Sequence, residues 1–184
     1  MVDIFNEGTP VTLMDVLNNK EWRVDQQREL IAKYTNKVIV AVKLNVPGKI
    51  KSNRYITCLF QAGWKKLIAN YAEQQVITDM VYVDRLTGPE GFIVIDDDVN
   101  TVKQQAIKFE INFRAGRLFD IDVMGGDGKD KQLSRTDLGF DPRKCFVCDQ
   151  PAKVCARSQK HDINTMKSAI NTLCNEYFEV NEYA

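Results

Sequence analysis

Apolar residues recur along the chain with two different spacings, and these spacings predict its secondary structure. Residues 37–44 are almost entirely apolar, which is typical of a central strand buried on both faces. Residues 54–71 place apolar side chains three or four positions apart, as on one face of an amphipathic helix. Further helices are predicted at 13–17, 21–34, 99–109 and 163–173.

Shorter apolar runs on either side of turn-forming residues predict hairpins. The runs 79–85 and 92–95 flank a segment that contains a Gly-Pro pair, which is a strong turn signal. We therefore expect these two runs to form an antiparallel pair. The same reasoning predicts a second hairpin, with strands at 116–124 and 132–135 around the glycine-rich turn 125–128.

Polar residues mark where several of the helices begin. Thr12 and Asp15 have the spacing of a capping box. The acidic run 96–98 and Asp162 can cap later helices, and capping explains the acidic run better than a metal site does. The elements lack a regular βαβ alternation, so we expect one α+β domain over residues 1–184, with a mixed sheet and a cysteine-rich segment at about 142–161.

Asp120 and Asp122 are the leading candidates for catalytic residues. Residues two apart on a strand share one face, where Leu118 and Met124 would flank the pair, while Arg117 would lie on the opposite face. Two carboxylates on a half-apolar face repel each other and resist desolvation unless a cation offsets the charge. Mg²⁺ with phosphate oxygens is a common solution. A plain polar strand face at a sheet edge is the alternative.

The charge balance narrows the class of function. The chain has 25 Lys and Arg residues and 25 Asp and Glu residues, so its formal net charge is zero. Proteins that hold nucleic acid non-specifically usually carry a basic excess, so we expect no nucleic-acid partner. Because we find no membrane-spanning apolar run and no secretion-signal pattern, we expect a cytoplasmic protein with no membrane partner.

Four potential metal ligands gather near the C-terminus with the spacing C-x₂-C-x₆-C-x₅-H, which suits a tetrahedral Zn²⁺ site. They are Cys145, Cys148, Cys155 and His161. His161 is the only histidine of the chain, so it is either the fourth zinc ligand or an acid–base catalyst. The alternative is a surface histidine above small buried cysteines. We expect Cys58 and Cys174 at core or near-core positions of helices.

Basic residues flank the predicted turns and strand ends. If the strands share one sheet, these residues converge at one end of it. Cations opposite a metal-binding carboxylate pair are what a polyphosphate site requires, although each residue alone is typical of a solvated surface charge. The residues concerned are Lys49, Lys51, Arg54, Arg114, Arg117, Arg135 and Arg143.

Several sequence blocks together resemble one known family. The most specific are Gly-Arg-Leu-Phe-Asp-Ile-Asp-Val at 116–123 and Cys-Ala-Arg-Ser at 155–158. The supporting blocks include Arg23 with Gln27, Asn45-Val-Pro-Gly48 with Lys51, Arg54 with Phe60 and Gly63, Leu133-Ser-Arg135, and Arg143-Lys-Cys-Phe-Val-Cys148. In this order they resemble the apo-citrate lyase phosphoribosyl-dephospho-CoA transferases, also called citrate lyase holo-acyl-carrier-protein synthases.

The resemblance implies a nucleotidyltransferase-like fold and a specific reaction. The phosphoribosyl-dephospho-CoA group of triphosphoribosyl-dephospho-CoA would pass to a serine of the apo acyl carrier (gamma) subunit of citrate lyase, and pyrophosphate would leave. Asp120 and Asp122 would hold Mg²⁺ against the triphosphate, and one of them is a candidate base. The residues that would contact the substrate and its phosphates are Asn45, Lys51, Arg54, Arg117, Arg135 and Arg143.

Two other functions stay open from the sequence. One is a nucleotidyltransferase that acts on a different acceptor, and zero net charge disfavours a nucleic acid in that position. The other is a non-catalytic zinc-knuckle interaction module. A single histidine and the lack of a Gly-x-Ser-x-Gly motif disfavour histidine-driven nucleophilic catalysis.

Overall fold

A four-stranded sheet is the centre of the computed structural model, which describes residues 2–72, 75–125 and 133–180. The strands follow the spatial order β2-β3-β1-β4. Their bounds are Val38–Leu44 for β1, Val76–Tyr82 for β2, Glu90–Ile95 for β3 and Phe119–Gly125 for β4. The predicted buried strand at 37–44 and the predicted hairpin of β2 and β3 are confirmed.

The expectation of a mixed sheet is wrong, because every strand pairing among the described residues is antiparallel. The order of the strands gives the reason. The crossover from β1 to β2 and the crossover from β3 to β4 each skip one position in the sheet. Strands that run in the same direction are therefore never neighbours.

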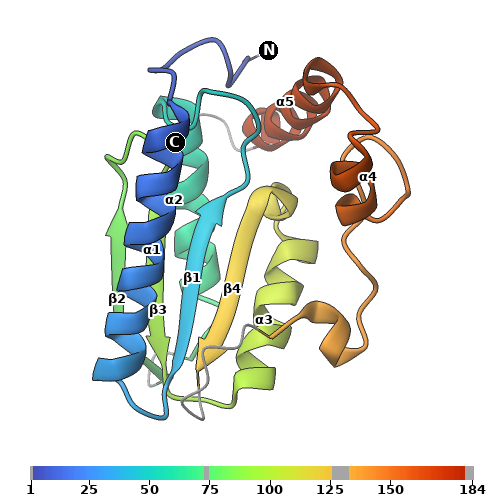
Figure 1. The fold of residues 1–184 in the computed structure, drawn as a ribbon. Helices are drawn as coiled ribbons and strands as arrows, with labels where there is room; N and C mark the ends of the chain where they lie inside the picture. Colours follow the sequence, from blue (N-terminus) through green and yellow to red (C-terminus); the bar gives the residue numbers. More distant parts are fainter. Residues whose placement is uncertain (1, 73–74, 126–132, 181–184) are drawn as a thin grey trace.

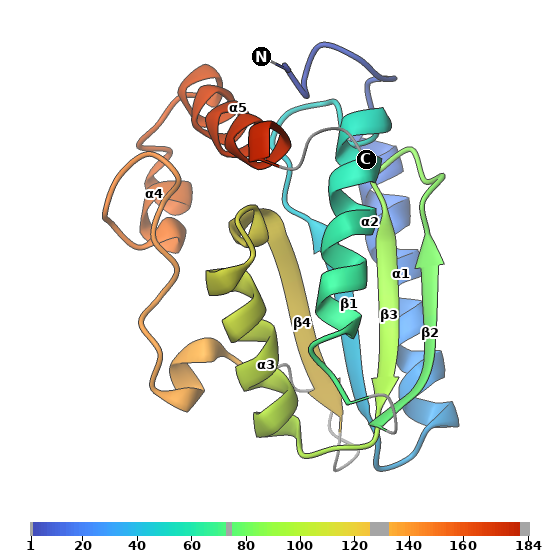
Figure 2. The ribbon, with the colours of Figure 1, turned by 180° about the vertical axis from the view of Figure 1, so that it is seen from behind.

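Helices cover both faces of the sheet (Figure 1). Helix α1 (Leu13–Lys33) lies on one face. Helices α2 (Arg54–Ile68) and α3 (Val99–Asn112) lie on the other face, which Figure 2 shows from behind. The two helical stretches expected before β1 form the single helix α1, since its tertiary contacts outweigh the weak helix propensity of two adjacent asparagines.

The expected caps are confirmed. The Thr12 hydroxyl accepts a hydrogen bond from the Asp15 backbone N–H, and the Asp15 carboxylate accepts one from the Thr12 backbone N–H. Asp98 caps α3. Asp162 accepts hydrogen bonds from two backbone N–H groups at the start of α5 (Ile163–Val180). These caps satisfy backbone donors that would otherwise lack partners.

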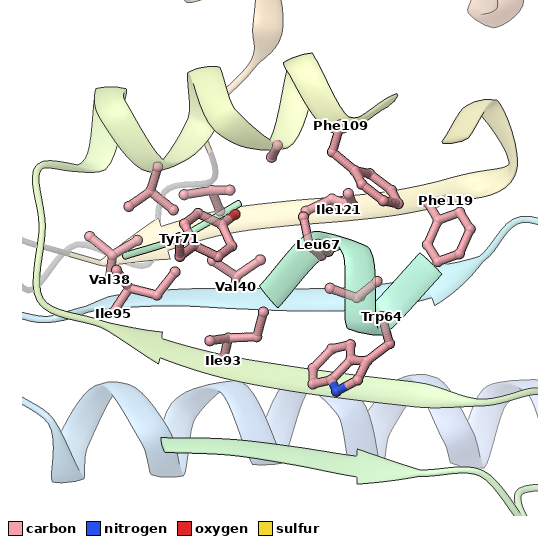
Figure 3. Close-up of a cluster of buried hydrophobic side chains, with 14 of the residues drawn as sticks. Val38, Val40, Trp64, Leu67, Tyr71, Ile93, Ile95, Phe109, Phe119 and Ile121 are labelled. Carbon is pink, nitrogen blue, oxygen red and sulfur yellow. The ribbon is translucent and has the colours of Figure 1, made fainter. Parts of the chain in front are cut away.

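The core lies mainly between the sheet and the pair α2 and α3 (Figure 3). The Phe119 ring packs directly on Gly63 of α2, where an added Cβ would lie only 2.1 Å from the ring's Cζ atom. On the opposite face, Leu30 of α1 packs with Phe92 and Met124 of the sheet. Strand β4 is thus packed on both faces. This packing fixes the positions of the less buried residues that alternate with its buried residues.

Strand β4 begins later than predicted. Gly116–Leu118 forms a 3₁₀ turn, because the chain bends tightly after α3 with Gly116 against the backbone of Glu110. The turn breaks the expected period of two. Leu118 therefore packs in a different cluster and does not flank the aspartates, whereas Met124 lies on their face as expected.

Residues 133–162 form an outer segment beside β4 and α3 (Figures 1 and 2). It contains a 3₁₀ helix, Arg135–Leu138, and helix α4, Ala152–Ser158. The prediction of a strand at 132–135 is wrong for the described residues 133–135, because Ser134 caps the 3₁₀ helix through a capping box. Residues 126–128 of the expected turn lie outside the described residues. No helix among the described residues combines the length and apolarity needed to cross a membrane.

Candidate active site

A cavity of about 1180 Å³ lies where β4, α3 and the outer segment meet. Asp120 and Asp122 line it from the sheet, and Lys103 and Glu110 line it from α3. The outer segment and the turn before β4 contribute cations to the same lining. These cations include Arg117, Arg135 and Arg143.

The two aspartates lie on the face of β4 that α1 covers, and each meets cations. Asp122 Oδ2 lies 3.2 Å from Arg23 Nη2. Asp120 lies 3.7 Å from Lys43 Nζ and 3.6 Å from Arg143 Nη1, distances longer than those of hydrogen bonds. The Asp120 and Asp122 side chains are 35% and 25% exposed, so their oxygens remain accessible to a cation in the cavity.

Arg23 fixes the position of Asp122 from the protein interior. It is buried, and its guanidinium also pairs with the buried carboxylate of Glu90. Asn19 donates a second hydrogen bond, of 2.9 Å, to Glu90. A buried ion pair keeps its geometry only when its remaining hydrogen-bonding groups are satisfied. This network therefore ties α1 and β3 to the aspartate pair.

Glu110 is the main residue of the site that the sequence did not reveal. Its carboxylate is nearly fully buried and faces three guanidinium groups. Oε1 lies 2.9 Å from Arg135 Nη1 and 4.0 Å from Arg117 Nη1, while Oε2 lies 2.8 Å from both Nε and Nη2 of Arg143. Three cations around one carboxylate leave an excess of positive charge.

Lys103 is a second residue that the sequence did not reveal. Its Nζ atom donates a 3.0 Å hydrogen bond to the Ile121 carbonyl at the edge of the sheet. Burial lowers the pKa of Lys103, although the nearby Asp122 carboxylate opposes this change. The only sequence signal for either residue is a charge on the otherwise apolar face of α3, close to Ala106 and Phe109.

The structure brings together only part of the predicted phosphate-binding set. Asn45, Arg117, Arg135 and Arg143 line the cavity with the aspartate pair, and their contacts to phosphate stay a prediction. Arg117 reaches the cavity despite its expected position on the opposite face, because it belongs to the 3₁₀ turn.

Lys51 and Arg54 do not line this cavity. The Lys51 ammonium donates to the Val46 carbonyl, and burial lowers its pKa. Arg54 is exposed and pairs with Glu7 at 3.0 Å. Both side chains therefore lie away from the aspartate pair's cavity, and their expected phosphate contacts stay a prediction.

The three cysteines and the histidine of the outer segment form a compact cluster. The ligand atoms of Cys145, Cys148, Cys155 and His161 all lie within 4.8 Å of one another. Cys148 Sγ lies 3.6 Å from Cys155 Sγ and 3.3 Å from His161 Nε2. Three thiols and one imidazole are a donor set that fits tetrahedral Zn²⁺.

The other two cysteines lie outside this cluster. Cys174 is buried in the core, as expected, whereas Cys58 is exposed. The expectation for Cys58 is therefore wrong. Helix α2 turns its apolar face to the sheet through residues such as Phe60 and Leu67, and Cys58 lies on the opposite side.

The loop that carries this cluster also contacts the arginines. Arg117 donates a hydrogen bond to the Lys144 carbonyl, and its guanidinium lies 4.6 Å from the centre of the Phe146 ring. The loop closes on itself, since the Ala152 N–H donates to the Arg143 carbonyl at 2.8 Å. The cysteine cluster and the arginine cluster therefore belong to one continuous structure.

Sequence comparisons relate this site to a known family. Residues 11–177 match the family model of the CitX apo-citrate lyase phosphoribosyl-dephospho-CoA transferases. The chain belongs to this family. The matched range includes the aspartate pair, Glu110 and the whole cysteine–histidine cluster, and it confirms the resemblance drawn from the sequence blocks.

Relatives of the transferase family differ in length. The chain is 30% identical over 177 residues to a probable apo-citrate lyase phosphoribosyl-dephospho-CoA transferase of Streptococcus pyogenes serotype M18, covering 96% of this chain and 92% of the relative. It is 31% identical over 171 residues to the protein of the same name from Vibrio cholerae serotype O1, covering 91% and 93%.

A longer relative has a different coverage. The chain is 40% identical over 176 residues to Protein CitXG of Leuconostoc mesenteroides subsp. cremoris. The match covers 96% of this chain but only 38% of that relative. The chain therefore spans little more than a third of the length of that relative.

Proposed function

We propose that the chain transfers the phosphoribosyl-dephospho-CoA group of triphosphoribosyl-dephospho-CoA to a serine of the apo acyl carrier subunit of citrate lyase. One observation carries this proposal. In a chain of the transferase family, Asp120 and Asp122 face the same cavity as Arg117, Arg135 and Arg143. Carboxylates that can hold a metal, next to cations that can bind phosphate, are the requirements of a nucleotidyl-type transfer.

The proposed reaction forms one bond and breaks another. The serine oxygen of the carrier attacks the phosphorus nearest the ribose, and the bond from that phosphorus to the pyrophosphate oxygen breaks. An aspartate of the pair accepts the serine proton. The nucleophile belongs to the carrier, so the chain itself needs to supply only orientation, charge and a proton acceptor.

We assign Asp120 and Asp122 as the residues that would hold Mg²⁺. Both carboxylates face the cavity, and the cation contacts of Asp120 are long enough to be exchanged. Bound there, Mg²⁺ would neutralise charge on the phosphate oxygens. Arg23 keeps Asp122 in place, and Asn45 contributes a polar side chain to the same lining.

We also propose that Cys145, Cys148, Cys155 and His161 hold a structural Zn²⁺. All four side chains would be used as ligands, which leaves His161 no role in acid–base chemistry. A closed site of four protein ligands is typical of structural zinc and contributes directly to folding. Thiols that stay reduced fit a cytoplasmic location, which is where we place the protein.

A reconstituted reaction tests the proposed function. The chain is mixed with Mg²⁺, triphosphoribosyl-dephospho-CoA and the apo carrier subunit, and the carrier is then weighed by mass spectrometry. We expect the carrier to gain the mass of the phosphoribosyl-dephospho-CoA group, and pyrophosphate to appear in equal amount. A carrier with its acceptor serine replaced by alanine is the control and should gain nothing. An unmodified wild-type carrier would refute the proposal.

A further inference from the structure

We infer that Arg117, Arg135 and Arg143 form the subsite for the leaving pyrophosphate, and that Glu110 is the positioning residue that assembles them. This inference rests on the proposed function, because it assigns one part of the triphosphate to one part of the cavity. The resemblance implies only that these arginines contact substrate phosphates; the inference adds Glu110 as the residue that assembles them and assigns them the leaving pyrophosphate.

Glu110 is the common partner of cations that come from three separate places. Arg117 comes from the turn before β4, Arg135 from the 3₁₀ helix, and Arg143 from the loop before Cys145. Each guanidinium lies within 4.0 Å of the Glu110 carboxylate. Like charges from separate elements repel each other, so a buried carboxylate at their centre is what holds them together.

The arginines retain hydrogen-bond donors for an anion. A guanidinium has five N–H donors in a planar fork that matches phosphate oxygens. Arg135 uses Nη1 for Glu110, while its buried Nε atom has no hydrogen-bond partner among the described residues. A buried donor without an acceptor is costly unless a ligand supplies one. Arg135 lines the cavity, so an anion bound there would lie next to a guanidinium that has an unused donor.

Charge and position favour pyrophosphate as that ligand. Three guanidinium groups face the Glu110 carboxylate, and Arg143 also lies 3.6 Å from Asp120, so one positive charge remains in excess. The leaving pyrophosphate is the most highly charged fragment of the substrate. Arg143 contacts both Glu110 and Asp120. An anion bound to the arginines would therefore lie next to the proposed Mg²⁺ ligands. The two outer phosphates must occupy such a position when the inner phosphate is attacked.

Binding of inorganic pyrophosphate tests the subsite without any carrier. We expect the full chain with Mg²⁺ to bind pyrophosphate in calorimetry, and pyrophosphate to inhibit carrier modification competitively with the triphosphate precursor. Arg135→Met and Arg143→Met should each weaken pyrophosphate binding by at least about tenfold, because each removes a charged donor. Wild-type chain that does not bind pyrophosphate, or arginine variants that bind it normally, would overturn the subsite.

Glu110→Gln tests the positioning role. We expect about tenfold weaker pyrophosphate binding and a similar rise in KM for the precursor, with a much smaller change in kcat, since the arginines lose the charge that holds them together. Glu110→Asp should recover part of the binding, and Glu179→Gln, the same change at an exposed position, should have no effect. Unchanged or tighter binding in a folded Glu110→Gln chain would overturn the role of Glu110.

If Glu110→Gln does not fold, Glu110→Asp provides the same comparison, because it retains the charge but shortens its reach to the arginines. It should bind pyrophosphate more weakly than the wild type, and normal binding would contradict the positioning role. If pyrophosphate binds through the arginines but no carrier is modified, the proposed function fails while the subsite stands.

Discussion

The two sides of the cavity are held in place by different forces. On the sheet side, Phe119, Ile121 and Val123 of β4 are buried and alternate with the two aspartates. On the other side, Cys155 is the only buried residue of the outer segment, residues 133–162, all of which the structure describes. The carboxylates thus sit on a packed frame, whereas the arginines opposite them depend on polar links.

The sheet side of the cavity is therefore preformed, whereas the side with the arginines must be assembled through polar contacts. Burial of apolar side chains stabilises a strand whether or not any ligand is present. Ion pairs to Glu110 join the outer segment to α3, and the cysteine–histidine cluster joins parts of the segment to one another. We therefore expect changes on the sheet side to affect chemistry or global stability, and changes in the outer segment to affect substrate binding first.

The largest effect is expected at the aspartate pair. Asp120→Asn and Asp122→Asn should each lower the rate of carrier modification by about 10³-fold or more, because each removes a charge needed for metal and phosphate. Both side chains are partly exposed, so thermal unfolding should change little. Mass spectrometry of the carrier and calorimetry measure the two effects. A double variant with full activity would remove the pair from the proposed mechanism.

A large effect on stability is expected at the buried network behind Asp122. Arg23→Met leaves the Glu90 carboxylate buried without its charged partner, which should lower the free energy of unfolding by about 3–5 kcal/mol. The double variant Arg23→Met, Glu90→Met removes both charges and should recover much of that loss. Urea denaturation measures both variants. An Arg23→Met chain as stable as the wild type would show that Asn19 alone satisfies Glu90.

A more local effect is expected at the cysteine–histidine cluster. The wild-type chain, purified without chelator, should contain about one zinc ion per chain, and Cys148→Ser should lose it. Proteolysis should then cut residues 133–162 faster, and the KM for the precursor should rise about tenfold, equivalent to about 1.4 kcal/mol.

The matched control for that variant is Cys58→Ser, which is exposed and lies outside the cluster. It should keep both the zinc and the KM. The β-sheet should unfold at nearly the same temperature in both variants, because its core lies elsewhere. Metal-free Cys148→Ser protein with normal proteolysis and normal KM would contradict a structural role for zinc.

The smallest effect is expected at the start of α1. Thr12→Ala removes the hydroxyl of the capping box and should cost about 1 kcal/mol of stability. Thr12→Ser keeps the hydroxyl and serves as the matched control. Because Thr12 lies outside the cavity lining, the KM for the precursor should stay unchanged. A raised KM would mean that loss of global stability alone disturbs the arginines.

Local spacing was sufficient to predict several features of this protein. The period of two on β4 placed Asp120 and Asp122 together, and the C-x₂-C-x₆-C-x₅-H spacing identified the cysteine–histidine cluster. The capping box at Thr12 is likewise a contact between residues three apart. These features depend on neighbours along the chain, so a single sequence contains the information that they require.

The arrangement of the arginines was decided only by the tertiary structure. Arg135 and Arg143 lie 25 and 33 residues from Glu110 along the chain, and Arg23 lies 99 residues from Asp122. The antiparallel sheet and the bend at Gly116 are also products of long-range packing. The sequence by itself determined the elements and the reactive residue types. The tertiary structure determined which residues these pair with, because a buried charge must be paired with groups that packing places next to it.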